Sequence, residues 1–154
     1  MRHAALWPWM MQPGELMVPD FIALAAVVIV LFSSAYFSMA SLPFLLVRLD
    51  IPEVSRLFRG LFNVYFWMIG ISGLLATTVF AARGRMAFAA AMLLLAVTAM
   101  ALRRRVLRLI DRQQTASQSG DAAARRQLRL IHWGGMLANA GVLASVAISV
   151  PLIV

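Results

Sequence analysis

The residues best suited to chemistry stand in the stretch RLIHWGGMLAN, residues 129–139, where a charged segment becomes apolar. His132 could accept a proton or bind a metal, and Asn139 follows seven residues later on the same helix face. A haem needs a second axial ligand, and His3, the only other histidine, lies beyond three apolar segments and so across a membrane. Zinc would need nearby carboxylate or thiolate ligands. We therefore interpret His132, beside Trp133, as a packing or headgroup residue at a membrane interface.

Other polar side chains interrupt the apolar segments. Ser34, Ser38 and Ser41 share one helix face. The positions of six polar residues along the predicted spans place them in the cytoplasmic half of the membrane, where we expect them to form a shared polar seam: Ser38, Ser41, Asn63, Thr98, His132 and Asn139. The favoured interpretation is hydrogen bonding between helices, worth about 0.6 kcal/mol per contact, and the alternative is a pocket for a substrate or a lipid headgroup. No Asp, Glu or Arg stands within the spans beside this seam, which disfavours ion-coupled transport.

The N-terminus holds a weaker metal candidate. Met1-Arg2-His3 could bind copper through the amine and the imidazole, and Met10 and Met11 are soft ligands for Cu(I). One histidine near a terminus is common by chance, so we expect neither a metal nor another cofactor. No serine–histidine–acid set, phosphate loop or carboxylate pair has credible spacing, and enzyme activity is the minority hypothesis.

The composition determines the environment in which these residues must be placed. Of 154 residues, 62% are hydrophobic and 13% are charged, which a soluble fold of this size cannot bury. There is no cysteine, and all 14 basic residues are arginine, giving a net charge of +8. Because the arginines cluster at the ends of apolar segments, we expect them to meet anionic lipid headgroups rather than nucleic acid.

Four apolar segments predict four membrane spans, which makes the chain an all-α, four-helix integral membrane bundle. An outer N-terminal segment, residues 1–20, precedes a membrane domain, residues 21–154. Pro43 predicts a kink, Pro52 with Glu53 predicts a short interfacial helix, and Gly84 predicts a reversal. Helix three is expected to continue as an amphipathic extension, and Ser119 or Asp121 to cap the returning helix after the helix-breaking TASQSGD. The predicted spans cover residues 21–47, 61–82, 86–102 with the extension to 113, and 131–153.

The arginines predict the orientation, because basic residues collect on the cytoplasmic side. Eleven arginines fall in the two connections that follow spans one and three, and three fall on the other side. Both termini are therefore expected outside a bacterial inner membrane, with the extension between helices 3 and 4 in the cytoplasm. The arginines expected to bind headgroups are Arg103, Arg104, Arg105, Arg108, Arg125, Arg126 and Arg129.

Two motifs resemble a known family. Arg126 and Arg129 precede His132, Asn139 follows it, and LFRGLFNVYFW, residues 57–67, opens the second span. Together they resemble small four-helix bacterial membrane proteins that carry a domain of unknown function and are related to eukaryotic transmembrane protein 205. The chain departs from that pattern at Gly135, where a small hydroxyl residue is common. The resemblance implies four helices and no established reaction. A weaker similarity links the chain to anthrone-oxygenase-like membrane proteins.

Three functions follow from these observations. The first is a non-catalytic accessory or scaffold subunit of a larger membrane complex, because small residues on the spans permit close helix contact with other membrane subunits. The second is an accessory for small-molecule or lipid transport that uses the polar seam. The third is a metal- or haem-linked membrane oxidoreductase.

Overall fold

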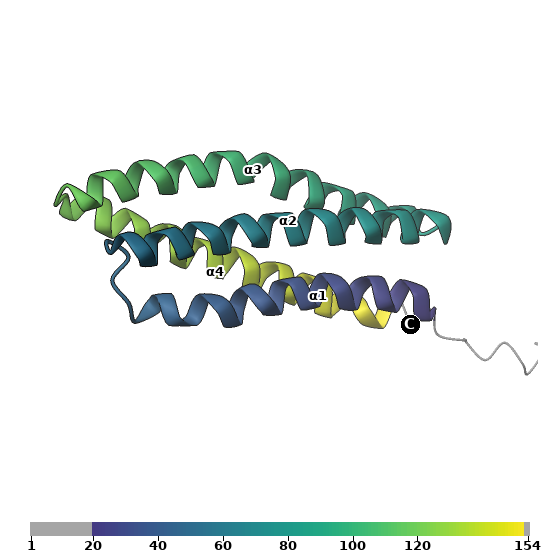
Figure 1. Ribbon diagram of the computed structural model, residues 1–154. Coiled ribbons are helices and arrows are strands. Elements are labelled where there is room, and N and C mark those ends of the chain that lie inside the picture. The colour runs from purple at the N-terminus through teal and green to yellow at the C-terminus, as the bar shows by residue number, and fades with distance from the viewer. Residues whose placement is uncertain (1–19, 153–154) are drawn as a thin grey trace, which may run out of the picture.

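The computed structural model describes residues 20–152, and within them the fold is four long helices without a strand (Figure 1). The helices are α1 (Phe21–Ser41), α2 (Pro52–Ala82), α3 (Met86–Gln118) and α4 (Ala122–Ser149), with short 3₁₀ turns at Leu42–Leu45 and Val150–Leu152. All four are long and apolar enough to cross a membrane. The predicted all-α, multi-pass helical fold is confirmed at this level.

Local chemistry explains where the helices begin. The Asp20 carboxylate accepts a hydrogen bond from the Ala23 amide at 3.1 Å, and the Asp121 carboxylate accepts one from the Ala123 amide at 2.8 Å. Both are N-caps that satisfy amides with no partner inside their helix. Asp121 is thus the predicted cap of α4, whereas Ser119 ends α3. Gly84 and Gly120, with φ of 69° and 94°, form the turns before α3 and α4.

Helix bounds differ from the predicted spans in three places. The expected interfacial helix at Pro52 runs without a break into the second span, since Ser55 and Phe58 continue the buried face of α2. Helix α3 continues to Gln118, because Ser117 is still buried against the bundle. Helix α1 ends at Ser41, before Pro43, whose ring removes an amide and tightens the last residues into a 3₁₀ turn.

The four helices run alternately up and down, so the α1–α2 and α3–α4 connections lie at the same end of the bundle (Figure 1). We call this the arginine-rich end, because Arg83 and Arg85 are the only arginines of residues 20–152 outside the half of the bundle nearest it. Helix α2 packs extensively on α1 and α3, whereas α4 touches its two neighbours much less. Helix α4 is therefore the least closely packed of the four helices.

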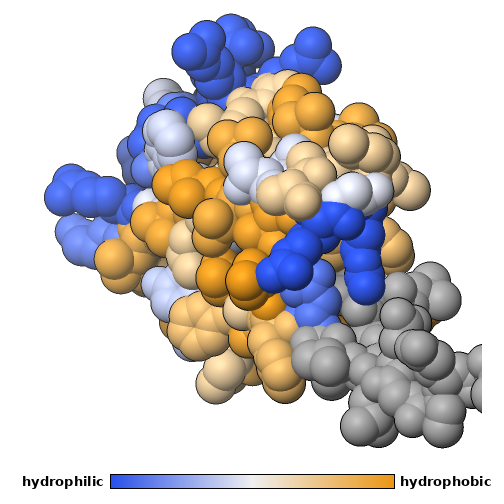
Figure 2. All heavy atoms as spheres, turned by 90° about the vertical axis from the view of Figure 1, so that its right-hand side faces the viewer, coloured by the Kyte–Doolittle hydropathy of each residue, from blue (hydrophilic) through white to orange (hydrophobic). Residues whose placement is uncertain are grey.

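The core divides into an aromatic half and an aliphatic half. Near the arginine-rich end the buried residues include Phe37, Phe58, Phe62, Tyr65 and Phe66. Toward the other end they are mainly small or aliphatic: Ala23, Ala26, Val27, Val30, Ala76, Phe80, Ala89, Met92 and Val146. The outer faces carry many exposed large apolar side chains, and Figure 2, which looks along the bundle from the arginine-poor end, shows hydrophobic residues over most of the surface. Such a surface suits lipid.

Candidate functional site

Helix α4 holds one buried polar contact on the face that meets α1. Asn139 is completely buried, and its side-chain amide donates to the Ser34 carbonyl oxygen at 2.9 Å and to Ser38 Oγ at 2.8 Å. Asn139 Oδ1 and Ser34 Oγ, also buried, have no partner within residues 20–152. The pairing of Ser38 with Asn139 makes this part of the predicted seam an α1–α4 contact.

His132 lies on the same side of α4, nearer the arginine-rich end. Its side chain is 2% exposed and meets the edges of Phe58 and Phe44, with ring centroids 5.5 and 6.4 Å away and planes nearly perpendicular. The Ser41 backbone also faces the imidazole. Because the imidazole is enclosed while Trp133 is exposed, His132 packs inside the bundle and Trp133 is the residue available to the interface.

The other two predicted seam residues lie elsewhere. Asn63 Oδ1 accepts two hydrogen bonds from the Arg103 guanidinium, at 2.9 and 2.6 Å, and this guanidinium also lies 5.1 Å from the centre of the Trp67 ring. Asn63 therefore joins α2 to α3. Thr98 lies on α3, in the wall of a groove beside α4. The six residues expected to share one seam are thus divided among three places.

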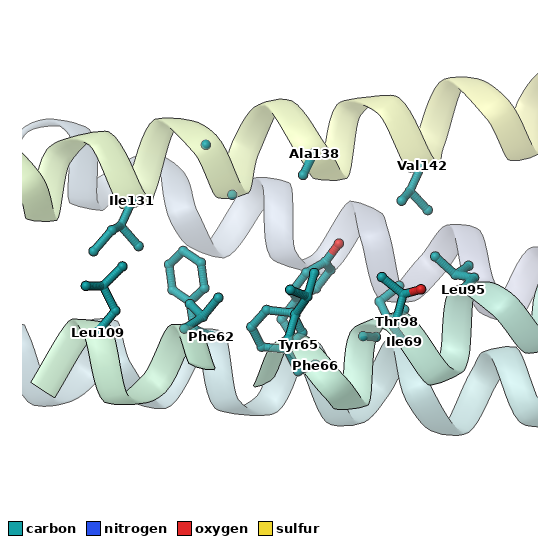
Figure 3. Close-up of a pocket in the computed structure, with 15 residues that line it drawn as sticks. Phe62, Tyr65, Phe66, Ile69, Leu95, Thr98, Leu109, Ile131, Ala138 and Val142 are labelled. Carbon is teal, nitrogen blue, oxygen red and sulfur yellow. The ribbon is translucent and has the colours of Figure 1, made fainter. Parts of the chain in front are cut away.

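A groove between α3 and α4 is a feature that the sequence did not reveal (Figure 3). Its first hollow has a volume of about 370 Å³, and α2 forms the floor of that hollow. A second hollow of about 450 Å³ continues it toward the arginine-poor end and shares Leu95, Ala138 and Val142 with it. We call the two together the α3–α4 groove. The first hollow is lined by Phe62, Tyr65, Phe66, Ile69, Leu95, Thr98, Ala99, Leu102, Val106, Leu109, Ile131, Gly134, Gly135, Ala138 and Val142.

Small side chains on α4 keep the groove open. A Cβ atom built on Gly134 or Gly141 would meet no neighbour within 4 Å. By contrast, a Cβ on Gly73 of α2 would lie 3.0 Å from Ala96 Cβ on α3, so the α2–α3 contact is already filled. The side between α3 and α4 is therefore open at these glycines, whereas the α2–α3 contact is filled at Gly73.

Two hydroxyl groups interrupt the apolar wall. Figure 3 shows the Tyr65 hydroxyl pointing across the groove toward α4, and Thr98 standing on the α3 wall. Tyr65 is only 8% exposed, yet its hydroxyl forms no hydrogen bond within residues 20–152. Thr98 is exposed, and its hydroxyl also forms no hydrogen bond within these residues. An unpaired hydroxyl in an apolar environment is unfavourable, so these groups are available to a ligand.

The arginines expected to bind headgroups fall into two groups. Several are already engaged: Arg103 with Asn63, Arg108 with the Arg104 carbonyl oxygen, Arg125 with Asp50 at 3.7 Å, and Arg129 with the Leu45 carbonyl oxygen. The exposed side chains of Arg104, Arg105 and Arg126 form no ion pair within the described part of the chain. Free cationic groups therefore remain near the arginine-rich end.

A separate basic notch of about 380 Å³ lies where the α1–α2 connection meets the start of α4, lined by Arg48, Leu49, Asp50, Arg125 and Arg129. Arg48 Nη2 lies 2.8 Å from Asp50 Oδ2. The hydrogen bond from Arg48 holds the pKa of Asp50 below its usual value. This carboxylate joins the connection to α4 and offsets part of the positive charge.

Side chains that could bind a metal are scattered in the described part of the chain. Within residues 20–152 no three His, Asp or Glu side chains gather closely enough to hold an ion. The N-terminal candidates His3, Met10 and Met11 lie outside the described residues. The metal-linked oxidoreductase remains a sequence-based hypothesis.

No protein-family model, curated protein or solved structure matches this chain. The resemblance to relatives of transmembrane protein 205 therefore stays a prediction, and function must be argued from the molecule itself.

Proposed function

We propose that this is a non-catalytic integral membrane protein that handles lipid, holding the apolar chain of a membrane lipid in the α3–α4 groove. The observation that carries the proposal is an apolar groove between two helices that are each long enough to cross a membrane. A groove in that position opens sideways to lipid, which is the one abundant apolar ligand there. Of the sequence-derived functions, lipid handling is the one this geometry favours.

The groove is long enough to hold an acyl chain. On α3 the lining runs from Phe88 to Leu109. At 1.5 Å per residue this is about 32 Å, longer than the roughly 15 Å of hydrocarbon that one acyl chain crosses in its own leaflet. The aliphatic and aromatic lining offers dispersion contacts along that whole length.

Native mass spectrometry after gentle extraction from the cell membrane tests the proposal. The wild-type protein should carry lipid, and Ala138→Leu, which fills the groove where its two hollows meet, should lose it. Ala140→Leu is the matched control, since Ala140 is exposed on α4 but does not line the groove. Equal lipid retention by the two variants, or none in the wild type, would contradict lipid binding in the groove.

A second candidate is the accessory subunit first expected from the sequence. Gly134, Ala138 and Gly141 lie at three- and four-residue spacing on the exposed side of α4, as in surfaces where transmembrane helices meet. The same spectra distinguish the candidates, because an adduct that resolves into a polypeptide rather than a lipid supports a partner helix.

We further propose the orientation with both termini outside the bacterial inner membrane and the arginine-rich end in the cytoplasm. The chain has no cysteine, so single cysteines report topology directly. In intact cells an impermeant maleimide should label Ala82→Cys, near the arginine-poor end, and should label Ser119→Cys only after the membrane is opened. The opposite labelling pattern would reverse the topology.

A further inference from the structure

We infer that the lipid in the α3–α4 groove is an anionic glycerophospholipid, with an ester carbonyl hydrogen-bonded to Tyr65 and its phosphate beside Arg105. This inference rests on the proposed function and adds the chemical class of the ligand and its placement along the groove.

The depth of Tyr65 is the first step. The Arg103 guanidinium bonds to Asn63 and lies over Trp67, and Tyr65 stands midway between these two residues on α2. Two residues correspond to about 3 Å along a helix, so Tyr65 is level with the guanidinium. A guanidinium and a tryptophan ring both favour the boundary between hydrocarbon and headgroups. Tyr65 therefore lies where the ester carbonyls of phospholipids lie.

The hydroxyl of Tyr65 is the second step. It points into the groove from a side chain that is 8% exposed, and no residue from 20 to 152 accepts its hydrogen bond (Figure 3). A carbonyl oxygen of a bound lipid would accept that bond. The lipid's two chains leave this point toward the arginine-poor end, and the second hollow continues the apolar wall in that direction.

Charge supplies the third step. Arg105 follows Thr98 by seven residues, so it lies on the groove face of α3 next to the lining residues Val106 and Leu109. It is two residues, about 3 Å, beyond Arg103 on the headgroup side. Its guanidinium is exposed and makes no ion pair within the described residues. A phosphate is the anion that arginine binds best at this level.

Titration of the detergent-delipidated full-length protein, followed by native mass spectrometry, tests the carbonyl contact. The probes are dioleoyl phosphatidylglycerol and its diether analogue, which lacks only the carbonyl oxygens. A single neutral hydrogen bond makes the diester bind about fivefold tighter. Tyr65→Phe should remove this preference by weakening the diester alone, whereas Tyr36→Phe, which changes an exposed tyrosine of α1, should keep it.

Headgroup recognition is tested with dioleoyl phosphatidylcholine, which has the same chains. Phosphatidylglycerol, which lacks choline's compensating positive charge, should bind more tightly than phosphatidylcholine. Arg105→Gln should reduce that preference severalfold, whereas Arg104→Gln, one position off the groove face, should leave it unchanged. A preference that persists in Arg105→Gln, or that is absent from the wild type, overturns the assignment of the phosphate.

The outcomes separate this inference from the proposed function. Equal binding of diester and diether by the wild type, with Ala138→Leu still blocking both, overturns the Tyr65 contact but supports the groove. If Ala138→Leu blocks neither lipid, the groove itself is not the binding site and both proposals fall. The diether probe changes the lipid only, so the result holds even where a variant folds poorly.

Discussion

The two sides of α4 differ in polarity and in how closely they are packed. Toward α1, the helix buries Asn139 and His132 among serine and aromatic partners. Toward α3, it presents Gly134 and Ala138 to an open groove. One helix thus has a closed polar side and an open apolar side. His132 and Asn139, which seemed best suited to bind a ligand, are used in packing. The side that can receive a ligand instead carries glycine and alanine.

This difference shows what each side requires in a membrane. Polar side chains in hydrocarbon need partners, so they draw helices together wherever partners face one another. Small residues draw helices together only when a surface reaches them, and α3 does not reach Gly134 or Gly141. The groove is therefore a place where packing is incomplete within the chain.

Replacement of two adjacent glycines should have the largest effect. A Cβ on Gly135 would lie 2.8 Å from Phe62 ring atoms, whereas one on Gly134 would meet nothing. Gly135→Leu should therefore lower the free energy of unfolding by about 1–3 kcal/mol through overpacking, and Gly134→Leu should leave it unchanged or higher. Reversible unfolding in mixed micelles measures both. Equal destabilisation by Gly134→Leu and Gly135→Leu would show that the groove is closed in the micelle.

A smaller effect is expected on the closed side. Asn139→Leu removes the hydrogen bonds to Ser34 and Ser38 and should cost about 1 kcal/mol, with lower protein abundance in the membrane. A double-mutant cycle with Ser38→Ala measures the coupling, which should be about 0.6–1.7 kcal/mol. Normal abundance together with loss of lipid binding would instead make Asn139 a ligand-binding residue.

The smallest effect concerns the Asp50 carboxylate of the α1–α2 connection, which lies beside Arg125 of α4. Its pKa is lowered, mainly by the hydrogen bond from Arg48, so its contribution to stability is complete above the unfolded-state value of about 4. The contribution is lost as the pH falls through the lower folded-state value. Asp50→Asn should therefore lower the unfolding temperature slightly at pH 7, and the difference from wild type should shrink as the pH falls below the unfolded-state value and through the lower folded-state pKa. A difference that grows in acid would contradict the ion pair.

Much of the architecture was predictable from the sequence because long uncharged segments have few alternatives to helices in a membrane. The pairing of Ser38 with Asn139 was also foreseeable, since both residues stand at the same depth. Depth alone could not reveal that Asn63 pairs with Arg103, because a long arginine side chain reaches neighbours beyond its own turn.

The groove could not be predicted because it is a shortage of side chains between two helices far apart in sequence. A partial signal existed on α3, where Leu95, Thr98, Leu102, Val106 and Leu109 recur at three- and four-residue spacing. That spacing is typical of a helix contact. Only the structure shows that the facing side of α4 carries the small residues Gly134 and Ala138, which leave the contact unfilled.

Spin labelling on α4 in lipid bilayers tests most directly whether the α3–α4 side is open to lipid. The absence of cysteine allows single labels at Gly134→Cys and Ala138→Cys, with Leu137→Cys, 69% exposed, and Val30→Cys, on the buried face of α1, as references. The readout is relaxation caused by doxyl-labelled phospholipid chains. An open groove predicts that labels at 134 and 138 contact the chains as the label at 137 does. Labels at 134 and 138 as shielded as the label at 30 would contradict the account.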